Sequence, residues 1–164
     1  FQRNNLFQNL SVQENLRLAV QAHHRSRLNF FAPAAGVALL TERAEELLRQ
    51  VHLDQDGSRP VRNLSYGEQR QLEIGLALAA EPDLLLLDEP TSGMSPAETG
   101  SMIDLIASLP RSMSILMIEH DMKVVFSVAD RISVLYYGEV LATGSPAEIE
   151  ANERVREVYL GARH

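Results

Sequence analysis

The stretch LLLLDEPTSG (residues 84–93) places two adjacent carboxylates directly after an unbroken run of four leucines. A second apolar run, MSILMI (113–118), ends two residues before His120. Continuously apolar strands are typical of a parallel sheet covered by helices on both faces, so the pattern predicts an α/β fold. Ligands of such sheets bind beyond the carboxyl ends of the strands. We therefore expect Asp88, Glu89 and His120 at the edge of one crevice.

The other expected elements extend on both sides of these strands. Apolar residues at helical spacing alternate with short apolar runs, and turn residues separate them. We expect helices at 11–27, 36–52, 66–80, 96–109 and 121–129, strands at 83–88, 113–118 and 132–137, a hairpin around 137–139, and short helices after it.

Composition limits the classes of protein to consider. A chain of 164 residues, 45% of them hydrophobic, suffices for one globular core, so we expect one domain or a large piece of one. There is no cysteine, which excludes disulfides and thiolate metal sites and favours a reducing compartment such as the cytosol. A net charge of −7 disfavours a nucleic-acid-binding surface. No apolar run approaches the roughly 18 residues that span a bilayer.

The pattern Ser-x-x-Glu occurs at 11–14, 65–68, 95–98 and 145–148, and each copy predicts a capped helix N-terminus. Capping is a sufficient explanation for the copy at 145–148. In the copy at 65–68, Gly67 lies in the first helical turn, where glycine costs about 1 kcal/mol relative to alanine. Its missing side chain would let a group approach the backbone amides, and a helix N-terminus favours an anion such as phosphate. For Ser65 and Gly67 a capping role and a binding role both stay open.

The residues after the two strands also have ordinary explanations, because Asp88 and Glu89 can be a solvent-facing turn and His120 a surface residue. Taken with the start of the 66–80 helix, however, they suit a nucleoside triphosphate. One carboxylate would hold Mg²⁺, one would orient or deprotonate a water molecule, and the imidazole would contact phosphoryl oxygens.

The segment LSYGEQRQLEIGLALAAEPDLLLLDEPTSG (64–93), followed by IEHD (118–121), resembles the ATP-binding subunit of an ABC transporter. The signature motif, Walker B strand, D-loop and switch histidine of that family stand in this order. FQRNNLFQNLSVQENL (1–16) is similar to the Q-loop and the segment after it. Tyr66, IEHDM and the ending VREVYLG resemble the ATPases of branched-chain amino acid uptake, and the lipopolysaccharide-export ATPase is similar at that ending.

The resemblance implies a partial ABC-type nucleotide-binding domain over residues 1–164, with a mostly parallel sheet, helices on both faces and an α-helical subdomain. The helical and signature subdomain would span about 11–80. The core strands, with Walker B and the switch histidine, would span 83–144, and C-terminal helices 145–164.

The resemblance also implies roles in binding Mg²⁺ and ATP. Asp88 would coordinate Mg²⁺, Glu89 would polarise the hydrolytic water, and His120 would contact the γ-phosphate. Gln2 would sense Mg²⁺ and water and link to the membrane subunits.

Other roles implied by the resemblance involve partner proteins. Ser65, Gly67 and Glu68 would meet the γ-phosphate of ATP held by a second ATP-binding subunit. The other partners would be transmembrane permease subunits, with no nucleic acid, and the location would be cytoplasmic and peripheral on the inner face of the cell membrane.

The sequence departs from the family pattern at three points. Tyr66 replaces the first of two glycines in the signature, and Ser95 replaces the usual aspartate of the D-loop. No G-x-x-x-x-G-K-[ST] segment occurs, and the only lysine is Lys123. We therefore expect that the N-terminal part of the domain is missing, and that this chain alone neither binds ATP tightly nor hydrolyses it, whereas the parent protein does both as a head-to-tail dimer.

Two alternatives stay open besides an importer or a lipopolysaccharide-export ATPase. One is a soluble ABC ATPase of DNA repair or translation. The other is a non-catalytic interaction module whose helices over 11–52 bind a partner.

Overall fold

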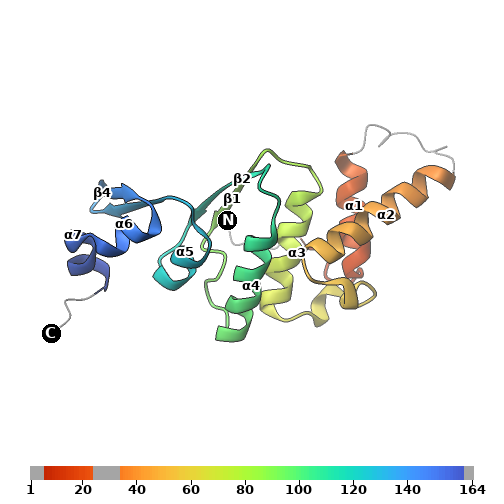
Figure 1. Ribbon diagram of the computed structural model, residues 1–164. Coiled ribbons are helices and arrows are strands. Elements are labelled where there is room, and N and C mark those ends of the chain that lie inside the picture. The colour runs from red at the N-terminus through yellow and green to blue at the C-terminus, as the bar shows by residue number, and fades with distance from the viewer. Residues whose placement is uncertain (1–5, 24–33, 161–164) are drawn as a thin grey trace. The chain divides into compact units, whose positions relative to one another are not determined.

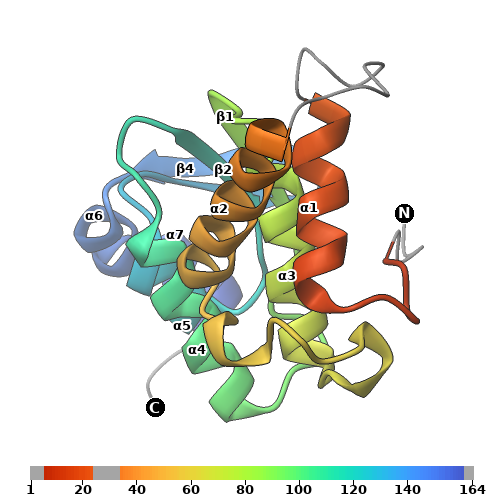
Figure 2. The same ribbon diagram turned by 90° about the vertical axis from the view of Figure 1, so that its right-hand side faces the viewer.

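Residues 6–23 and 34–160 are described in the computed structural model of the protein, shown in Figures 1 and 2. Their contacts divide the chain into two units, 1–118 and 119–164. The boundary falls inside the 83–144 segment that was expected to hold the core strands. Within the described residues, no helix combines the length and the apolar character needed to cross a bilayer.

The first unit begins with a group of helices that pack against one another (Figure 2). The elements are α1 (Val12–His23), α2 (Ala34–Gln50), the short 3₁₀ helices η1 (Asp54–Asp56) and η2 (Val61–Asn63), and α3 (Tyr66–Leu78). The helices α2 and α3 match the expected ones within two residues at each end, and α1 begins within one residue of the expected start. Residues 24–27 of the expected 11–27 helix lie outside the described residues.

Large aliphatic side chains fill the core between these helices. Leu16 of α1, Leu47 of α2 and Leu72 of α3 are fully buried. Gly75 of α3 permits a close approach, because a Cβ atom there would lie 3.0 Å from Leu16 Cδ2 and 3.3 Å from Val51 Cγ1. Burial of this apolar face stabilises the helices far more than their intrinsic propensities do.

A buried amide holds the segment that precedes α1. The Oδ1 atom of Asn15 accepts a hydrogen bond from Phe7 N–H at 2.9 Å. Its Nδ2 atom donates to the carbonyl oxygens of Phe7, at 3.2 Å, and Ser11, at 2.9 Å. Ser11 also accepts from Glu14 N–H at 3.1 Å, as the sequence pattern predicts for a helix cap. The polar atoms of Asn15 are thus satisfied although the residue is 2% exposed.

The first unit ends in a parallel pair of strands, β1 (Leu84–Asp88) and β2 (Ser114–Ile118), joined by α4 (Pro96–Ser108). The register pairs Leu84 with Ser114 and Asp88 with Ile118, so both carboxyl ends lie at the same edge.

In the described residues, helices cover one face of this pair rather than the two that were expected. Successive side chains of a strand point to opposite faces. Leu85 is buried and lines a small cavity with α3 and α4 residues. The opposite face is exposed over Leu84, Leu86, Leu116 and Ile118, which have between 51% and 65% of their surface accessible.

The second unit combines a hairpin with short helices. Its elements are α5 (Met122–Val128), β3 (Ile132–Tyr136), β4 (Glu139–Gly144), α6 (Pro146–Ala151), α7 (Glu153–Val155) and the π-helical turn η3 (Arg156–Leu160). The antiparallel hairpin β3–β4 is confirmed where it was expected. Tyr137 and Gly138 both have positive φ, 47° and 81°, as a type I′ turn requires. Ile132, Val134, Ile149 and Val155 form the core of this unit.

Candidate functional site

Two exposed carboxylates stand at the carboxyl end of β1. Asp88 is the last residue of the strand, and Glu89 follows it with a φ of 45°. The N–H of Glu89 donates to Ile118 O at 2.8 Å, which fixes its backbone to the end of β2. A non-glycine residue in the left-handed region costs on the order of 1–2 kcal/mol, and such residues cluster at functional sites.

The turn after these carboxylates is anchored by its next two residues. Pro90 and Thr91 are both buried, and the N–H of Ser92 donates to Glu89 O at 3.1 Å. The chain therefore turns inward directly after Glu89, whereas Asp88 and Glu89 themselves are exposed.

The described residues contain no group of three or more His, Cys, Asp or Glu side chains that could hold a metal ion. At this place Asp88 would therefore offer a metal ion one carboxylate. This donor set fits Mg²⁺, which keeps several waters and is bound through one or two carboxylates together with substrate phosphates. Gln2, the other expected Mg²⁺ contact, lies outside the described residues.

His120 belongs to the second unit, as does its neighbour Glu119. The His120 side chain is 72% exposed, whereas the Glu119 side chain is 1% exposed. Oε2 of Glu119 accepts from His120 N–H at 2.9 Å and lies 3.5 Å from His120 Nδ1. Asp121 caps α5 by accepting from Lys123 N–H at 2.9 Å. That His120 shares a crevice with Asp88 and Glu89 stays a prediction.

The predicted capping box at the start of α3 is present. Glu68 N–H donates to Ser65 Oγ at 3.3 Å, and Ser65 N–H donates to Glu68 Oε2 at 2.6 Å. The other oxygen of Glu68 lies 3.3 Å from Arg59 Nη1. The Glu68 carboxylate therefore accepts a hydrogen bond from the N-terminal cap residue of α3 and contacts the guanidinium of Arg59.

Gly67 contacts the carboxylate of Glu98, a residue that was not expected at this helix start. Its N–H donates to Oε1 of Glu98, in the first turn of α4, at 2.9 Å. A Cβ atom at position 67 would lie 2.8 Å from Glu98 Cγ. Close approach at Gly67 was expected, but the approaching group is a carboxylate of the same chain. The only sequence signal was the Ser-Pro-Ala-Glu pattern at 95–98.

Hydrogen bonds keep the Glu98 carboxylate ionised. Ser95 N–H donates to its Oε2 atom at 3.0 Å and Ser95 Oγ at 2.7 Å. These bonds, then those from Gly67 N–H and the Ser65 side chain, lower the pKa of Glu98 from 4.5 to about 2. The pKa of Glu148 is lowered as well, mainly by the backbone N–H of Ser145.

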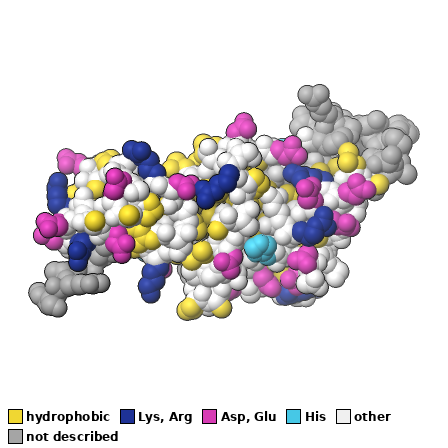
Figure 3. Space-filling view, viewed as in Figure 1, with side chains coloured by type: hydrophobic (Ala, Val, Ile, Leu, Met, Phe, Trp, Pro, Cys, Tyr) yellow, Lys and Arg dark blue, Asp and Glu magenta, His cyan; other side chains and the backbone are white. Residues whose placement is uncertain are grey.

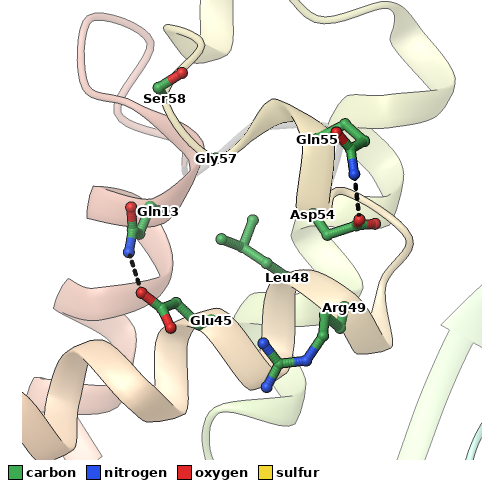
Figure 4. Close-up of a pocket in the computed structure, with 8 residues that line it drawn as sticks. All are labelled: Gln13, Glu45, Leu48, Arg49, Asp54, Gln55, Gly57 and Ser58. Carbon is green, nitrogen blue, oxygen red and sulfur yellow. Dashed lines mark hydrogen bonds between the residues drawn. The ribbon is translucent and has the colours of Figure 1, made fainter.

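None of these residues lines an open depression of about 470 Å³ beside α1, α2 and the loop after α2 (Figure 4). Its lining comprises Gln13, Glu45, Leu48, Arg49, Asp54, Gln55, Gly57 and Ser58. A smaller cavity of about 200 Å³ lies between α3, β1 and α4 and has Asp88 in its wall.

Charged side chains of both signs are interspersed on the face of the molecule seen in Figure 3. Apolar side chains are exposed between them (Figure 3). This face therefore carries no extended patch of one sign.

Comparison with known proteins agrees with the order of the motifs. The LivG protein of Salmonella typhimurium, a high-affinity branched-chain amino acid transport ATP-binding protein, is 39% identical over 98% of this chain and 66% of its own length. The lipopolysaccharide export system ATP-binding protein LptB of Escherichia coli is 33% identical, over 98% of this chain and 63% of LptB. The chain thus spans about two thirds of the length of these relatives.

A solved structure confirms the fold. The cbiO1 protein of Clostridium perfringens, part of the ABC transporter complex cbiONQ, superposes with a TM-score of 0.73 at 26% identity, over 97% of this chain and 60% of cbiO1. Residues 139–164 match the family described as branched-chain amino acid ATP-binding cassette transporter. Residues 1–92, more than half of the chain, match the family described as ABC transporter. The chain therefore belongs to the ABC transporter family.

Proposed function

We propose that this chain supplies the catalytic carboxylates of an ATP-hydrolysing subunit of an ABC transporter. The observation that carries the proposal is the exposed pair Asp88 and Glu89 at the carboxyl end of β1, with Glu89 held at positive φ by its bond to Ile118. In the proposal, Asp88 holds Mg²⁺ directly or through water, and Glu89 orients or deprotonates the attacking water. His120 donates a hydrogen bond to a phosphoryl oxygen.

The remaining roles in the proposal concern residues farther from this pair. Gln2 contacts Mg²⁺ and water. Ser65, Gly67 and Glu68 start the helix that meets ATP held by a second ATP-binding subunit. Transmembrane permease subunits are the other partners, which places the protein on the cytoplasmic face of the cell membrane.

The transported substrate in the proposal is a branched-chain or other amino acid. The branched-chain family match at 139–164 supports this choice over lipopolysaccharide export. The match to LivG supports it as well, because it holds 39% identity over 98% of the chain, whereas LptB proteins are 33% identical over 98% of it or 39% identical over 73% of it. The 164 residues hold no G-x-x-x-x-G-K-[ST] segment to cradle the β- and γ-phosphates. We therefore propose that they do not hydrolyse ATP without such a loop.

The test is a titration with Mg-ATP, followed by calorimetry, of this chain and of a longer chain that carries the phosphate-binding loop upstream of residue 1. We expect binding and turnover from the longer chain only. Binding to neither would favour a non-catalytic interaction module instead. Turnover by the 164 residues alone would contradict the inactivity proposed for them.

A pair of variants in the longer chain tests the role of Glu89. Glu89→Gln removes the base and is expected to lower turnover about 10²- to 10⁴-fold while ATP binding persists. Asp83→Asn is the matched control, because Asp83 is an exposed acid at the opposite end of β1. Equal turnover in Glu89→Gln and the parent chain would remove Glu89 from the mechanism.

A further inference from the structure

The carboxylate of Glu98 serves two helix N-termini at once. At its own helix, α4, Oε2 accepts from Ser95 N–H at 3.0 Å and from Ser95 Oγ at 2.7 Å. At α3, Oε1 accepts from Gly67 N–H at 2.9 Å. A carboxylate at a helix N-terminus is stabilised by the free N–H groups and by the positive end of the helix dipole. Glu98 therefore joins the first turns of two helices that are 31 residues apart in the sequence.

The fit of Glu98 over Gly67 leaves no room for a side chain. A Cβ atom at position 67 would lie 2.8 Å from Cγ, 2.9 Å from Cβ and 2.9 Å from Oε1 of Glu98. The lack of a side chain at Gly67 is thus accounted for by a group inside this chain, since separations under 3.0 Å require something to move.

Glu148 provides a comparison within the same chain, because it ends an identical Ser-Pro-Ala-Glu segment. It accepts from Ser145 N–H at 2.7 Å and from Ser145 Oγ at 2.8 Å. Among the described hydrogen bonds, none joins Glu148 to a second helix. The bond to Gly67 is therefore an addition to the capping box and not a consequence of it.

Three backbone amides at the start of α3 already donate hydrogen bonds to oxygens of this chain. Ser65 N–H is bonded to Glu68 Oε2 at 2.6 Å, Gly67 N–H to Glu98, and Glu68 N–H to Ser65 Oγ at 3.3 Å. An external phosphate that binds at Ser65 and Gly67 has to take the Gly67 N–H from the carboxylate. Two anions cannot share this donor at close range without strong repulsion, so Glu98 must then move away.

We propose that Glu98 is a positioning residue of the α3 N-terminus, a resident anion that holds Gly67 and that an incoming phosphate group must displace. The inference rests on the proposed binding of phosphate by Ser65 and Gly67. Displacement releases the first turn of α4 from α3. Because Ser95 and Glu98 follow the turn that begins at Glu89, phosphate at α3 is thereby coupled to the segment that carries the catalytic carboxylates.

The experiment follows the Gly67 amide of the full 164-residue chain by ¹H–¹⁵N NMR while inorganic phosphate is added at constant ionic strength. Glu98→Gln keeps the size of the side chain and removes its charge, and Glu148→Gln makes the same change in the matched segment. In Glu98→Gln, the chemical-shift change of the Gly67 amide should reach half its maximum at an about tenfold lower phosphate concentration than in the unaltered chain, since charged hydrogen bonds are about twice as strong as neutral ones. Glu148→Gln should behave as the unaltered chain. Equal midpoints in Glu98→Gln and the unaltered chain would overturn the proposal.

Hydrogen exchange without phosphate tests the contact itself. Gly67 should exchange faster in Glu98→Gln than in the unaltered chain and at an unchanged rate in Glu148→Gln, and no acceleration in Glu98→Gln would overturn the proposal. ATP turnover by the longer chain is a separate test of the proposed function. If the longer chain hydrolyses ATP but Glu98→Gln does not change phosphate binding at Gly67, only the role of Glu98 is refuted. If Glu98→Gln does strengthen phosphate binding at Gly67 but the longer chain does not hydrolyse ATP, only the proposed ATPase function is refuted.

Discussion

Replacing Gly67 with alanine tests the close contact between α3 and α4. In a helix interior, alanine is favoured over glycine by about 1 kcal/mol. The new Cβ would lie 2.8 Å from Glu98 Cγ and 2.9 Å from Glu98 Cβ. The Cβ of Glu98 is fixed to the backbone of α4, so a change of side-chain rotamer cannot relieve the overlap. Overpacking of this kind costs about 1–3 kcal/mol, and we expect Gly67→Ala to lower the free energy of unfolding by about 1 kcal/mol net.

Gly100 of α4 is the matched control, because a Cβ atom there would meet nothing within 4 Å. Gly100→Ala should therefore raise the free energy of unfolding by up to about 1 kcal/mol. Urea unfolding, followed by circular dichroism, measures both changes, provided that the denaturant slopes are unchanged. If Gly67→Ala stabilised the chain as much as Gly100→Ala does, the contact with Glu98 would be absent and the reasoning refuted.

Two further predictions concern groups that are bound by hydrogen bonds. The pKa of Glu98 is lowered from 4.5 to about 2, so the stability that its carboxylate contributes is present above pH 4.5 and is lost as the pH falls toward 2. In thermal melts between these pH values, the Glu98→Gln variant should therefore lose less stability than the unaltered chain. An identical loss in both would contradict the lowered pKa. Asn15→Leu removes the partner of the Phe7 N–H, whereas Phe7 O keeps its bond from Leu10 N–H, and the change should cost about 1 kcal/mol in urea unfolding. Hydrogen exchange at Phe7 should also become faster, and a neutral effect would show that the segment before α1 is held by other contacts.

Features encoded within a few residues could be predicted from the sequence. The Ser-x-x-Glu patterns at Ser65, Ser95 and Ser145 form capping boxes, because cap and partner lie in the same helical turn. The hairpin turn also forms where it was expected, and Gly138 adopts its positive φ without steric cost, whereas the positive φ of Tyr137 has no signal in its residue type. Strand ends were also predictable, since the last leucine of β1 precedes the polar Asp88.

Features that depend on distant partners were not predictable. The leucine run indicated a strand buried on both faces, yet Leu84 and Leu86 are exposed in the structure, because the composition of a strand does not reveal what covers each face. The positive φ of Glu89 also has no signal in its own residue type. It follows from the bond to Ile118, which only the pairing of β1 with β2 brings into place.

The two Ser-Pro-Ala-Glu segments show where local reasoning ends. Their four residues are identical and cap their helices in the same way, so any argument from the segment alone must assign them the same role. They differ because α3 brings Gly67 to Glu98, and no corresponding amide is bonded to Glu148 in the described residues. A glycine in one helix and a glutamate in another are each weak signals. Together they identify a single contact, and the contrast between Glu98→Gln and Glu148→Gln tests that contact rather than the motif.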